Sequence, residues 1–448
     1  MNPVFKEPTM PNASRSGVGT PSTGGPAHGR RISSGDGAPV GRVVPPLPKF
    51  CKEIVQRIPG SSHGETRLRY LLDTIQRMNE EQRTSLSGHL DLLLQYMLEI
   101  GASDMDFGGP AANQYVWYRV DGDKRPHEEA GTYAEDEASL IFLSILNEIQ
   151  VGVFFKNYSV DFSRMIGHVG KEGRRRFRCA LYFDNDQPAL SVRAITNDVR
   201  PLKTIAFHPV IERGLMFRYE RDGLTLITGV TGSGKSTTMD SIVDANNKDS
   251  AAHIVVSGQP IEYMHESKRS IVRHREVGKD VGSFKDGIVQ ALRQDPDMVV
   301  IGEMRDPVTI SSALEITDSG HKVFSTLHTS SAVESIDRII AEYPPHEQER
   351  VRNRLADVLR CVISQKLCPK IGGGRVLAKE VLWMLPSARA AIKNDNTSEI
   401  YQMMWEGGSH GQITMEQDLF RMVRQRLITP DTAMNYANNK RRLQQLMS

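Results

Sequence analysis

The sequence predicts a protein of two α/β parts: a small α+β domain, then a larger α/β domain whose sheet is mostly parallel. A chain of 448 residues is too long for one ordinary hydrophobic core, so two or three domains are expected. After about residue 206, helical segments separate short apolar strands, namely GLTLITG, HIVVS, DMVVIGE and KVFSTLH. This alternation is typical of a parallel sheet. Before residue 195, polar and apolar residues alternate as they do in antiparallel strands.

The first 48 residues are predicted to form a disordered tail. They are rich in Pro, Gly and Ser and have few large apolar side chains as far as Val43. Such a segment cannot bury enough surface to offset its chain entropy.

Residues 49–198 are predicted to form the smaller domain. A polar helical region containing LRYLLDTIQRM precedes a helix defined by Leu86, Leu90, Leu93, Leu94 and Met97. YVWYRVDGDKRP predicts a hairpin that turns at Asp121-Gly122. EDEASLIFLSILNEI predicts one helix, and RRRFRCALYF and PALSVRAI predict two antiparallel strands. TNDVRPLKTIAFHPV is the expected linker to the larger domain, residues 206–448, which ends in helices that include EQDLFRMVRQRL.

Composition limits the classes of function. Charged residues make up 25% and hydrophobic residues 39% of a chain with net charge +2, which fits a soluble protein and gives no general case for nucleic-acid or membrane binding. The four cysteines form no CxxC pair, so neither a zinc knuckle nor a disulfide framework is expected. Four scattered thiols fit the reducing environment of the cytosol. No apolar run is long enough to predict a membrane span.

A phosphate-binding loop is the strongest functional signal. GVTGSGKST matches G-x-x-x-x-G-K-[ST], follows an apolar strand and opens a helical segment. Backbone N–H groups and a helix N-terminus form an anion site there, which predicts the phosphates of a nucleotide as the ligand. Lys235 is expected to reach the β- and γ-phosphates, and the Ser236 hydroxyl to bind Mg²⁺. The expected nucleotide contacts are Gly229, Thr231, Gly232, Ser233, Gly234, Lys235, Ser236 and Thr237.

Two further strands end in side chains suited to phosphate chemistry. Ligands of parallel sheets bind at the carboxyl ends of strands, and DMVVIGE ends in Glu303. Glu303 is expected to hold Mg²⁺ through water or to orient the attacking water. Arg305 is expected to neutralise phosphate charge or to contact another subunit. The alternative is that it forms an ordinary surface salt bridge. His328, after KVFSTL, either senses the γ-phosphate or is structural.

Four ordered stretches together resemble one family, the secretion-motor ATPases, and most closely the pilus-retraction type that drives twitching motility. They are GVTGSGKSTT, QPIEYMHE, LRQDPDMVVIGEMRD and SGHKVFSTLHTSSAVESIDRII. The resemblance extends over roughly residues 85–430. It implies a PAS-like N-terminal domain, a RecA-like ATPase domain and a homo-hexameric ring at the cytoplasmic face of the bacterial inner membrane. Arg178 and Arg193 match two family arginines that approach the nucleotide.

The resemblance also implies mechanical work: ATP hydrolysis moves the ring against an inner-membrane platform protein of the pilus, and a paralogous motor ATPase is a further possible partner. Extension motors typically carry a four-cysteine zinc insert, so its absence favours the retraction type. A relative that serves a type IVb secretion system is similar too. SARAAIKN stands where the retraction type reads AIRNLIRE, which leaves the choice between retraction and general secretion open.

One departure from the family concerns catalysis. The family usually reads Glu-Asp-Pro-Ile-Glu where this chain reads Gly258-Gln259-Pro260-Ile261-Glu262, so two acids are missing and Glu262 is kept. ATP binding should survive, because its chemistry lies in the loop. Two explanations compete: a slow or accessory ring subunit, or a motor in which Glu262 or Glu303 replaces the missing acid.

A nucleic-acid motor is the third reading. RRRFR is the only candidate patch for nucleic-acid binding, and no aromatic and basic stretch suits stacking on a single strand. No nucleic-acid partner is therefore expected.

Overall fold

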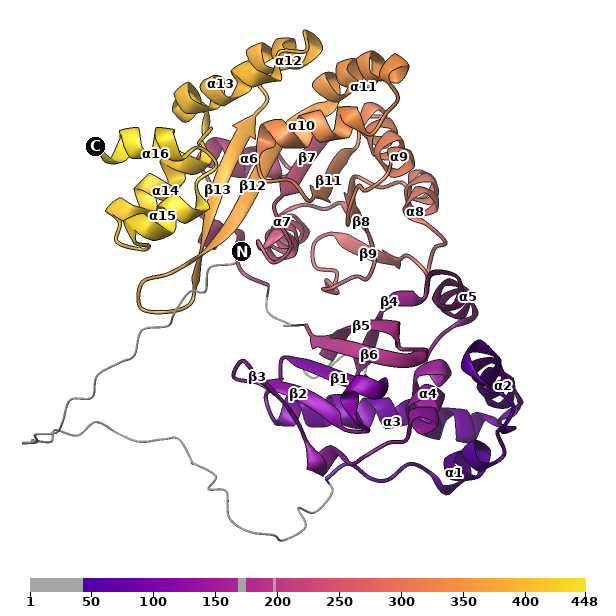
Figure 1. Cartoon of the computed structure of the whole chain (residues 1–448). Helices are drawn as coiled ribbons and strands as arrows, with labels where there is room; N and C mark the ends of the chain where they lie inside the picture. Colours follow the sequence, from indigo (N-terminus) through magenta and orange to yellow (C-terminus); the bar gives the residue numbers. More distant parts are fainter. Residues whose placement is uncertain (1–42, 168–174, 196–198) are drawn as a thin grey trace, which may run out of the picture. The chain divides into compact units, whose positions relative to one another are not determined.

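The protein is described by a computed structural model that covers residues 43–167, 175–195 and 199–448 (Figure 1). The predicted tail lies outside the described residues as far as residue 42. Residues 196–198 of the expected linker also lie outside them, and the rest of the linker contains a short 3-10 turn, Leu202–Ile205. No helix within the described ranges is long and apolar enough to cross a membrane.

The first three helices are α1 (Lys49–Gln56), α2 (Gly64–Arg77) and α3 (Glu80–Glu99). The α3 helix begins at a capping box, because the Asn79 side chain accepts a hydrogen bond of 2.8 Å from the Gln82 N–H. All five apolar residues that predicted α3 are buried, which confirms the helical spacing.

The single helix predicted for EDEASLIFLSILNEI is wrong. The structure has two helices, α4 (Glu135–Ser144) and α5 (Glu148–Asn157). The helix is interrupted before Asn147, whose side chain accepts a hydrogen bond from the Gln150 N–H at 2.8 Å and caps the second helix. The asparagine side chain accepts a hydrogen bond from the backbone in place of a helical carbonyl. The helix therefore ends and a new one begins, although the apolar periodicity is continuous.

The first sheet is antiparallel throughout, with strand order β3-β2-β1-β6-β5-β4. Its strands are β1 (Asp104–Gly108), β2 (Val116–Val120), β3 (Asp123–Pro126), β4 (Ser159–Ile166), β5 (Arg175–Asp184) and β6 (Gln187–Ala194). The β2–β3 hairpin turns at Asp121 and Gly122, both with positive φ, as DG between two strands predicts. The two strands predicted from RRRFRCALYF and PALSVRAI are β5 and β6.

The second sheet has strand order β13-β12-β7-β11-β10-β8-β9 and is parallel except for the β12–β13 pair. The four predicted strands are β7 (Gly223–Thr228), β8 (His253–Gly258), β10 (Met298–Ile301) and β11 (Lys322–Leu327). Three strands were not predicted from the alternation: β9 (Ile271–Glu276), β12 (Leu359–Pro369) and β13 (Arg375–Trp383). The expectation of a mostly parallel sheet is confirmed.

The central strands of this sheet are buried on both faces, so successive side chains enter two different cores. Leu224 and Leu226 lie in one core, whereas Ile227 lies in the other. This explains why the strands read as continuous apolar runs. Helix α6 (Pro209–Leu215) precedes the first strand of this sheet. The α-helices between its later strands are α7 (Lys235–Asp249), α8 (Phe284–Ala291), α9 (Pro307–Asp318), α10 (Ala332–Ala341) and α11 (Pro345–Val358).

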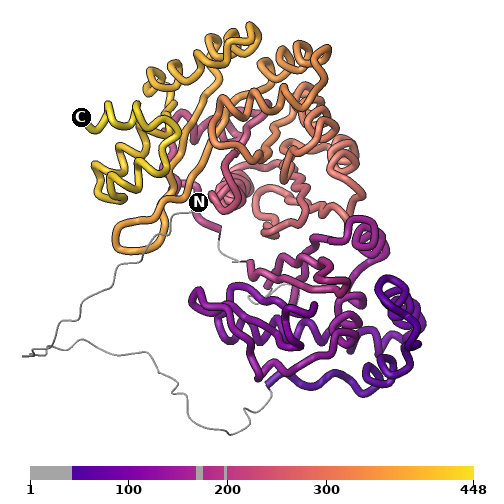
Figure 2. The backbone as a smooth tube through the Cα atoms, in the orientation of Figure 1, coloured from indigo at the N-terminus to yellow at the C-terminus, as the bar shows by residue number. Residues whose placement is uncertain are grey.

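The chain ends in five helices, as the sequence predicts: α12 (Pro386–Lys393), α13 (Ile400–Glu406), α14 (Met415–Arg424), α15 (Pro430–Tyr436) and α16 (Lys440–Met447). The last three form a small bundle with its own core, to which β12 contributes Cys368 and β13 contributes Ala378. Figure 2 shows this C-terminal bundle, α14–α16, beside the long β12–β13 hairpin.

Candidate functional site

The phosphate-binding loop connects β7 to α7, as its motif requires. Gly229, Gly232 and Gly234 all have positive φ, between 79° and 147°. A Cβ on Gly229 would lie 2.6 Å from the Gln365 carbonyl oxygen, so only glycine fits there. The first N–H groups of α7 have no partner within the helix, and they open onto this loop.

Lys235 is buried at the first position of α7, and only 8% of its surface is exposed. Its ammonium donates hydrogen bonds to the carbonyls of Gly229, at 2.7 Å, and Val230, at 3.2 Å. Burial lowers the pKa of Lys235, and the nearby carboxylates of Glu303 and Glu262 oppose that lowering. The loop thus holds a cation that interacts electrostatically with two acids, each from a segment that follows another strand.

The remaining loop side chains differ in exposure. Thr231, Ser236 and Thr237 are exposed, whereas Ser233 is buried. The Ser233 hydroxyl has no hydrogen-bond partner among the described residues. A buried polar atom without a partner is rare in proteins, and a phosphate oxygen would satisfy it.

Glu303 and His328 meet at the carboxyl end of the sheet. The strands end slightly earlier than predicted, β10 at Ile301 and β11 at Leu327, so both side chains stand on the loops just beyond. His328 Nε2 lies 3.0 Å from Glu303 Oε1, and Arg305 Nε lies 2.6 Å from the same oxygen. Burial, and then the charge of Lys235, lowers the pKa of His328.

The backbone around Glu303 is packed closely against the end of β8. The Gly302 N–H donates to the Ser257 carbonyl at 2.7 Å, and a Cβ on Gly302 would lie 3.2 Å from the Gly258 Cα. The missing family acid at Gly258 would therefore stand beside the residue that precedes Glu303. The neighbouring Gln259 is exposed.

The two arginines of the first sheet lie directly opposite each other, Arg178 on β5 and Arg193 on β6. Arg193 donates to Asp104 at 2.8 Å, and its side chain is 73% exposed. Arg178 lies 3.5 Å from Asp161 and 3.8 Å from Glu262. The structure thus brings Lys235, Glu262, Glu303, Arg305 and His328 together, while Arg193 is paired within its own sheet.

Two buried polar residues that contact α7 or the segment before Glu262 were not predicted from the sequence. Gln365, on the unpredicted strand β12, is 1% exposed and donates to the Thr238 hydroxyl of α7 at 2.8 Å. Glu276, at the end of β9, accepts from the Ser163 hydroxyl at 2.7 Å, forms a salt bridge with Arg176, and accepts from the Ile261 N–H at 3.4 Å. Neither residue lies in a motif. They could have been predicted only if β9 and β12 had first been recognised as strands of the sheet.

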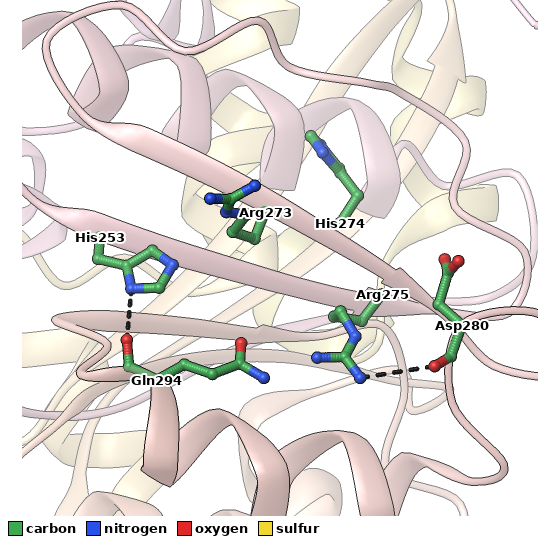
Figure 3. A pocket seen from close by; sticks show the side chains of 6 residues that line it. All are labelled: His253, Arg273, His274, Arg275, Asp280 and Gln294. Carbon is green, nitrogen blue, oxygen red and sulfur yellow. Dashed lines mark hydrogen bonds between the residues drawn. The ribbon is translucent and has the colours of Figure 1, made fainter.

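A separate hollow of about 610 Å³ lies along β9, lined by His253, Arg273, His274, Arg275, Asp280 and Gln294. Figure 3 shows His253 turned toward Gln294 and Arg275 toward Asp280. None of the predicted site residues lines it. The phosphate-binding loop, not this hollow, carries the site chemistry.

The residues present fit a Mg²⁺ ion together with a nucleotide. A hydroxyl from Ser236 and a carboxylate from Glu303 are hard oxygen donors, the class that Mg²⁺ prefers, and Mg²⁺ commonly shares its ligands with substrate phosphates. The unsatisfied hydroxyl of Ser233 and the buried cation of Lys235 add partners for phosphate oxygens.

Comparison with known proteins shows the family of this chain. Residues 213–425 match the family model described as type II/IV secretion system protein. A twitching motility protein of Neisseria gonorrhoeae is 36% identical over 322 residues, which are 72% of this chain and 84% of that protein. The type IV pilus retraction ATPase PilT of Pseudomonas aeruginosa is 37% identical over 345 residues, 77% of this chain and 97% of that protein.

The fold is shared as well. The crystal structure of the pilus retraction motor PilT with bound ADP aligns with a TM-score of 0.68 at 35% identity and covers 79% of this chain and 98% of that chain. These similarities confirm the resemblance and the predicted fold class, a RecA-like P-loop ATPase domain with a smaller N-terminal α+β domain. The chain belongs to the type II/IV secretion system ATPases and, among them, to the family of the pilus retraction ATPase PilT.

Proposed function

We propose that this chain is the motor subunit that couples ATP hydrolysis to the retraction of type IV pili. The observation that carries the proposal is the meeting of Lys235, Glu303 and His328 at the phosphate-binding loop, in a chain whose relatives are named as retraction ATPases. Helix α7 supplies Lys235, and the loops after β10 and β11 supply Glu303 and His328, so the arrangement depends on neighbouring strands and does not follow from the loop motif alone.

In the proposed mechanism the loop N–H groups and Lys235 hold the phosphates. Glu303 orients the attacking water, and His328, neutral because its pKa is lowered, reports the γ-phosphate to the sheet. Arg305 shares the Glu303 oxygen and restrains its carboxylate. Ser236 and Glu303 would hold the Mg²⁺ ion, which supplies neutralisation of phosphate charge when bound.

Glu262 is the kept acid of the altered motif. It lies close enough to Lys235 to influence the lysine pKa, so it is the second candidate for the acid that orients or deprotonates the attacking water. Gly258 and Gln259 support a rate below that of a motor with both acids, because loss of a general base typically costs about 10²–10⁴-fold. They also favour the second candidate function, a nucleotide-binding accessory subunit with slow turnover.

The assembly is part of the same proposal. We infer a homo-hexamer of two-domain subunits, divided near residues 198 and 206, at the cytoplasmic face of the inner membrane. In it Arg178 and Arg193 serve the nucleotide of a neighbouring subunit. The exposure of Arg193 supports this, since a side chain that is 73% exposed can reach a partner. The proposed partners are the inner-membrane platform protein of the pilus and a paralogous motor ATPase.

The cellular test is deletion of the gene in its own host. Twitching is expected to be lost and to return with the native gene but not with Lys235→Ala. An unchanged twitching phenotype would reject a role in retraction. It would leave the alternative that the motor serves another secretion system.

A further inference from the structure

Glu380 is a buried acid of β13 that none of the predictions used. It is 1% exposed, and its two carboxylate oxygens accept from two different backbone segments. Oε1 accepts from the Ala332 N–H at 2.7 Å, and Oε2 accepts from the Met415 N–H at 3.4 Å. Ala332 is the first residue of α10, and Met415 is the first residue of α14. One carboxylate thus binds the N-termini of two helices.

The first of these helices leads directly from the catalytic histidine. Only Thr329, Ser330 and Ser331 separate His328 from Ala332. Ser331 caps α10 by accepting from the Glu334 N–H. The Thr329 and Ser335 hydroxyls are hydrogen-bonded at 2.6 Å, so this connection is tied to the first turns of the helix. A shift of the α10 N-terminus therefore shifts the backbone that carries His328.

The second helix opens the C-terminal bundle, and the bundle makes its own contact with the same connection. The Asn438 amide, which precedes α16, donates to the Ser330 carbonyl at 3.2 Å. The side-chain oxygen of Asn438, Oδ1, accepts a hydrogen bond from the Lys366 ammonium of β12 at 2.5 Å, which fixes the orientation of the Asn438 side-chain amide. Residues 328–332 are therefore linked to the bundle at two points, through Glu380 of β13 and directly through Asn438.

Burial raises the pKa of Glu380 to about 7, and its hydrogen bonds to the two helix N-termini oppose that rise. Helix N-termini carry partial positive charge, and a carboxylate between two of them stabilises both. An amide of the same shape has one accepting oxygen and cannot serve both N–H groups. Lys366 and Glu416 are the charged side chains that act on Glu380 from the neighbouring elements, in opposite directions.

We propose that Glu380 is a positioning residue, which holds His328 in its catalytic place and links it to the C-terminal bundle. The link rests on the proposed function, in that it gives the bundle a route to the hydrolytic site. A movement of α14–α16 would reach His328 through one side chain.

The test compares Glu380→Gln with Asp418→Asn in the full chain. Asp418 is a matched control, because it is equally buried on α14 and accepts from the Lys379 N–H at 2.9 Å, but does not bond to residues 328–332. Hydrogen exchange of the peptide spanning residues 328–334 is measured together with kcat and KM for ATP. The exchange readout does not need turnover, so it separates failure of this link from failure of the ATPase proposal.

Glu380→Gln is expected to speed exchange in that peptide about tenfold and to lower kcat about tenfold, with KM unchanged, because one hydrogen bond to a charged group is lost. Asp418→Asn is expected to leave both values within twofold of the native chain. Unchanged exchange in Glu380→Gln, or equal effects in both variants, would overturn the proposal. If Glu380→Gln does not fold, the exposed Asn438→Ala variant replaces it, and unchanged exchange of residues 328–334 would then overturn the link.

Discussion

Glu303 Oε1 and His328 Nε2 lie 3.0 Å apart, each just past the end of one of two adjacent parallel strands. The pair forms because β10 and β11 run side by side in register and end at the same edge of the sheet. Burial lowers the pKa of His328, so at neutral pH its ring is neutral and donates to the carboxylate from Nε2. The contact joins the acid proposed to orient water to the histidine proposed to sense phosphate.

The first prediction concerns this pair. Glu303→Gln is expected to lower ATP turnover about 10²-fold or more, because the amide cannot act as an acid or base and binds a metal poorly. ATP affinity should change little, since the loop and Lys235 hold the phosphates. Turnover and nucleotide binding measured on the same preparation check this. An equal loss in affinity would place Glu303 in binding and not in hydrolysis.

The second prediction concerns the missing acids. Gly258→Glu with Gln259→Asp is expected to raise turnover about tenfold or more, because an acid returns beside Gly302. The gain is limited by packing, since a Cβ on Gly258 would lie 3.0 Å from Ile261 Cγ1. Gln259→Asp alone serves as the control and should gain less. A native chain that hydrolyses ATP and gains nothing from the double change would show that Glu262 or Glu303 already does the work.

The third prediction tests the ring arrangement through Arg178 and Arg193. A protein with both arginines changed to alanine, and a separate Lys235→Ala protein, should each be nearly inactive. Mixed together, they should regain part of the native turnover, because some interfaces then combine an intact loop with intact arginines. Mixtures no more active than their components would place the arginines at the nucleotide of their own chain, or away from it.

The fourth prediction is the pH dependence of stability through Glu380. Burial, opposed by its backbone hydrogen bonds, raises the pKa of Glu380 from 4.5 to about 7. Between these values the folded protein binds more protons than the unfolded chain, so the stability contributed by this group falls as pH rises through the window. Glu380→Gln removes the ionisation. The melting temperature of the variant relative to the native chain should therefore rise from about pH 5 to about pH 7 and then level off. A difference independent of pH would contradict this account.

The sequence predicted most of what local patterns control. The loop, the four central strands, the β2–β3 hairpin and the α3 helix follow from spacing and turn residues. The acid and the histidine of the candidate site follow from one rule about strand ends, and Lys235 follows from the loop motif. The break at Asn147 was missed because a capping side chain overrode a continuous apolar pattern.

Long-range pairing explains the other misses. Strand β9, with the letters IVRHRE, lies at the sheet edge and has mixed polarity, so periodicity did not reveal it. Gln365 and Glu380 take their roles from partners 127 and 48 positions away in the sequence. No local motif carries that information.

The most direct test of the central claim is ATP turnover of the purified full chain with Mg²⁺, beside Lys235→Ala as the background. The account predicts turnover clearly above that background, reduced by Glu303→Gln to near it. A native chain that binds ATP but hydrolyses it no faster than Lys235→Ala would contradict the motor proposal and identify an accessory, nucleotide-binding ring subunit.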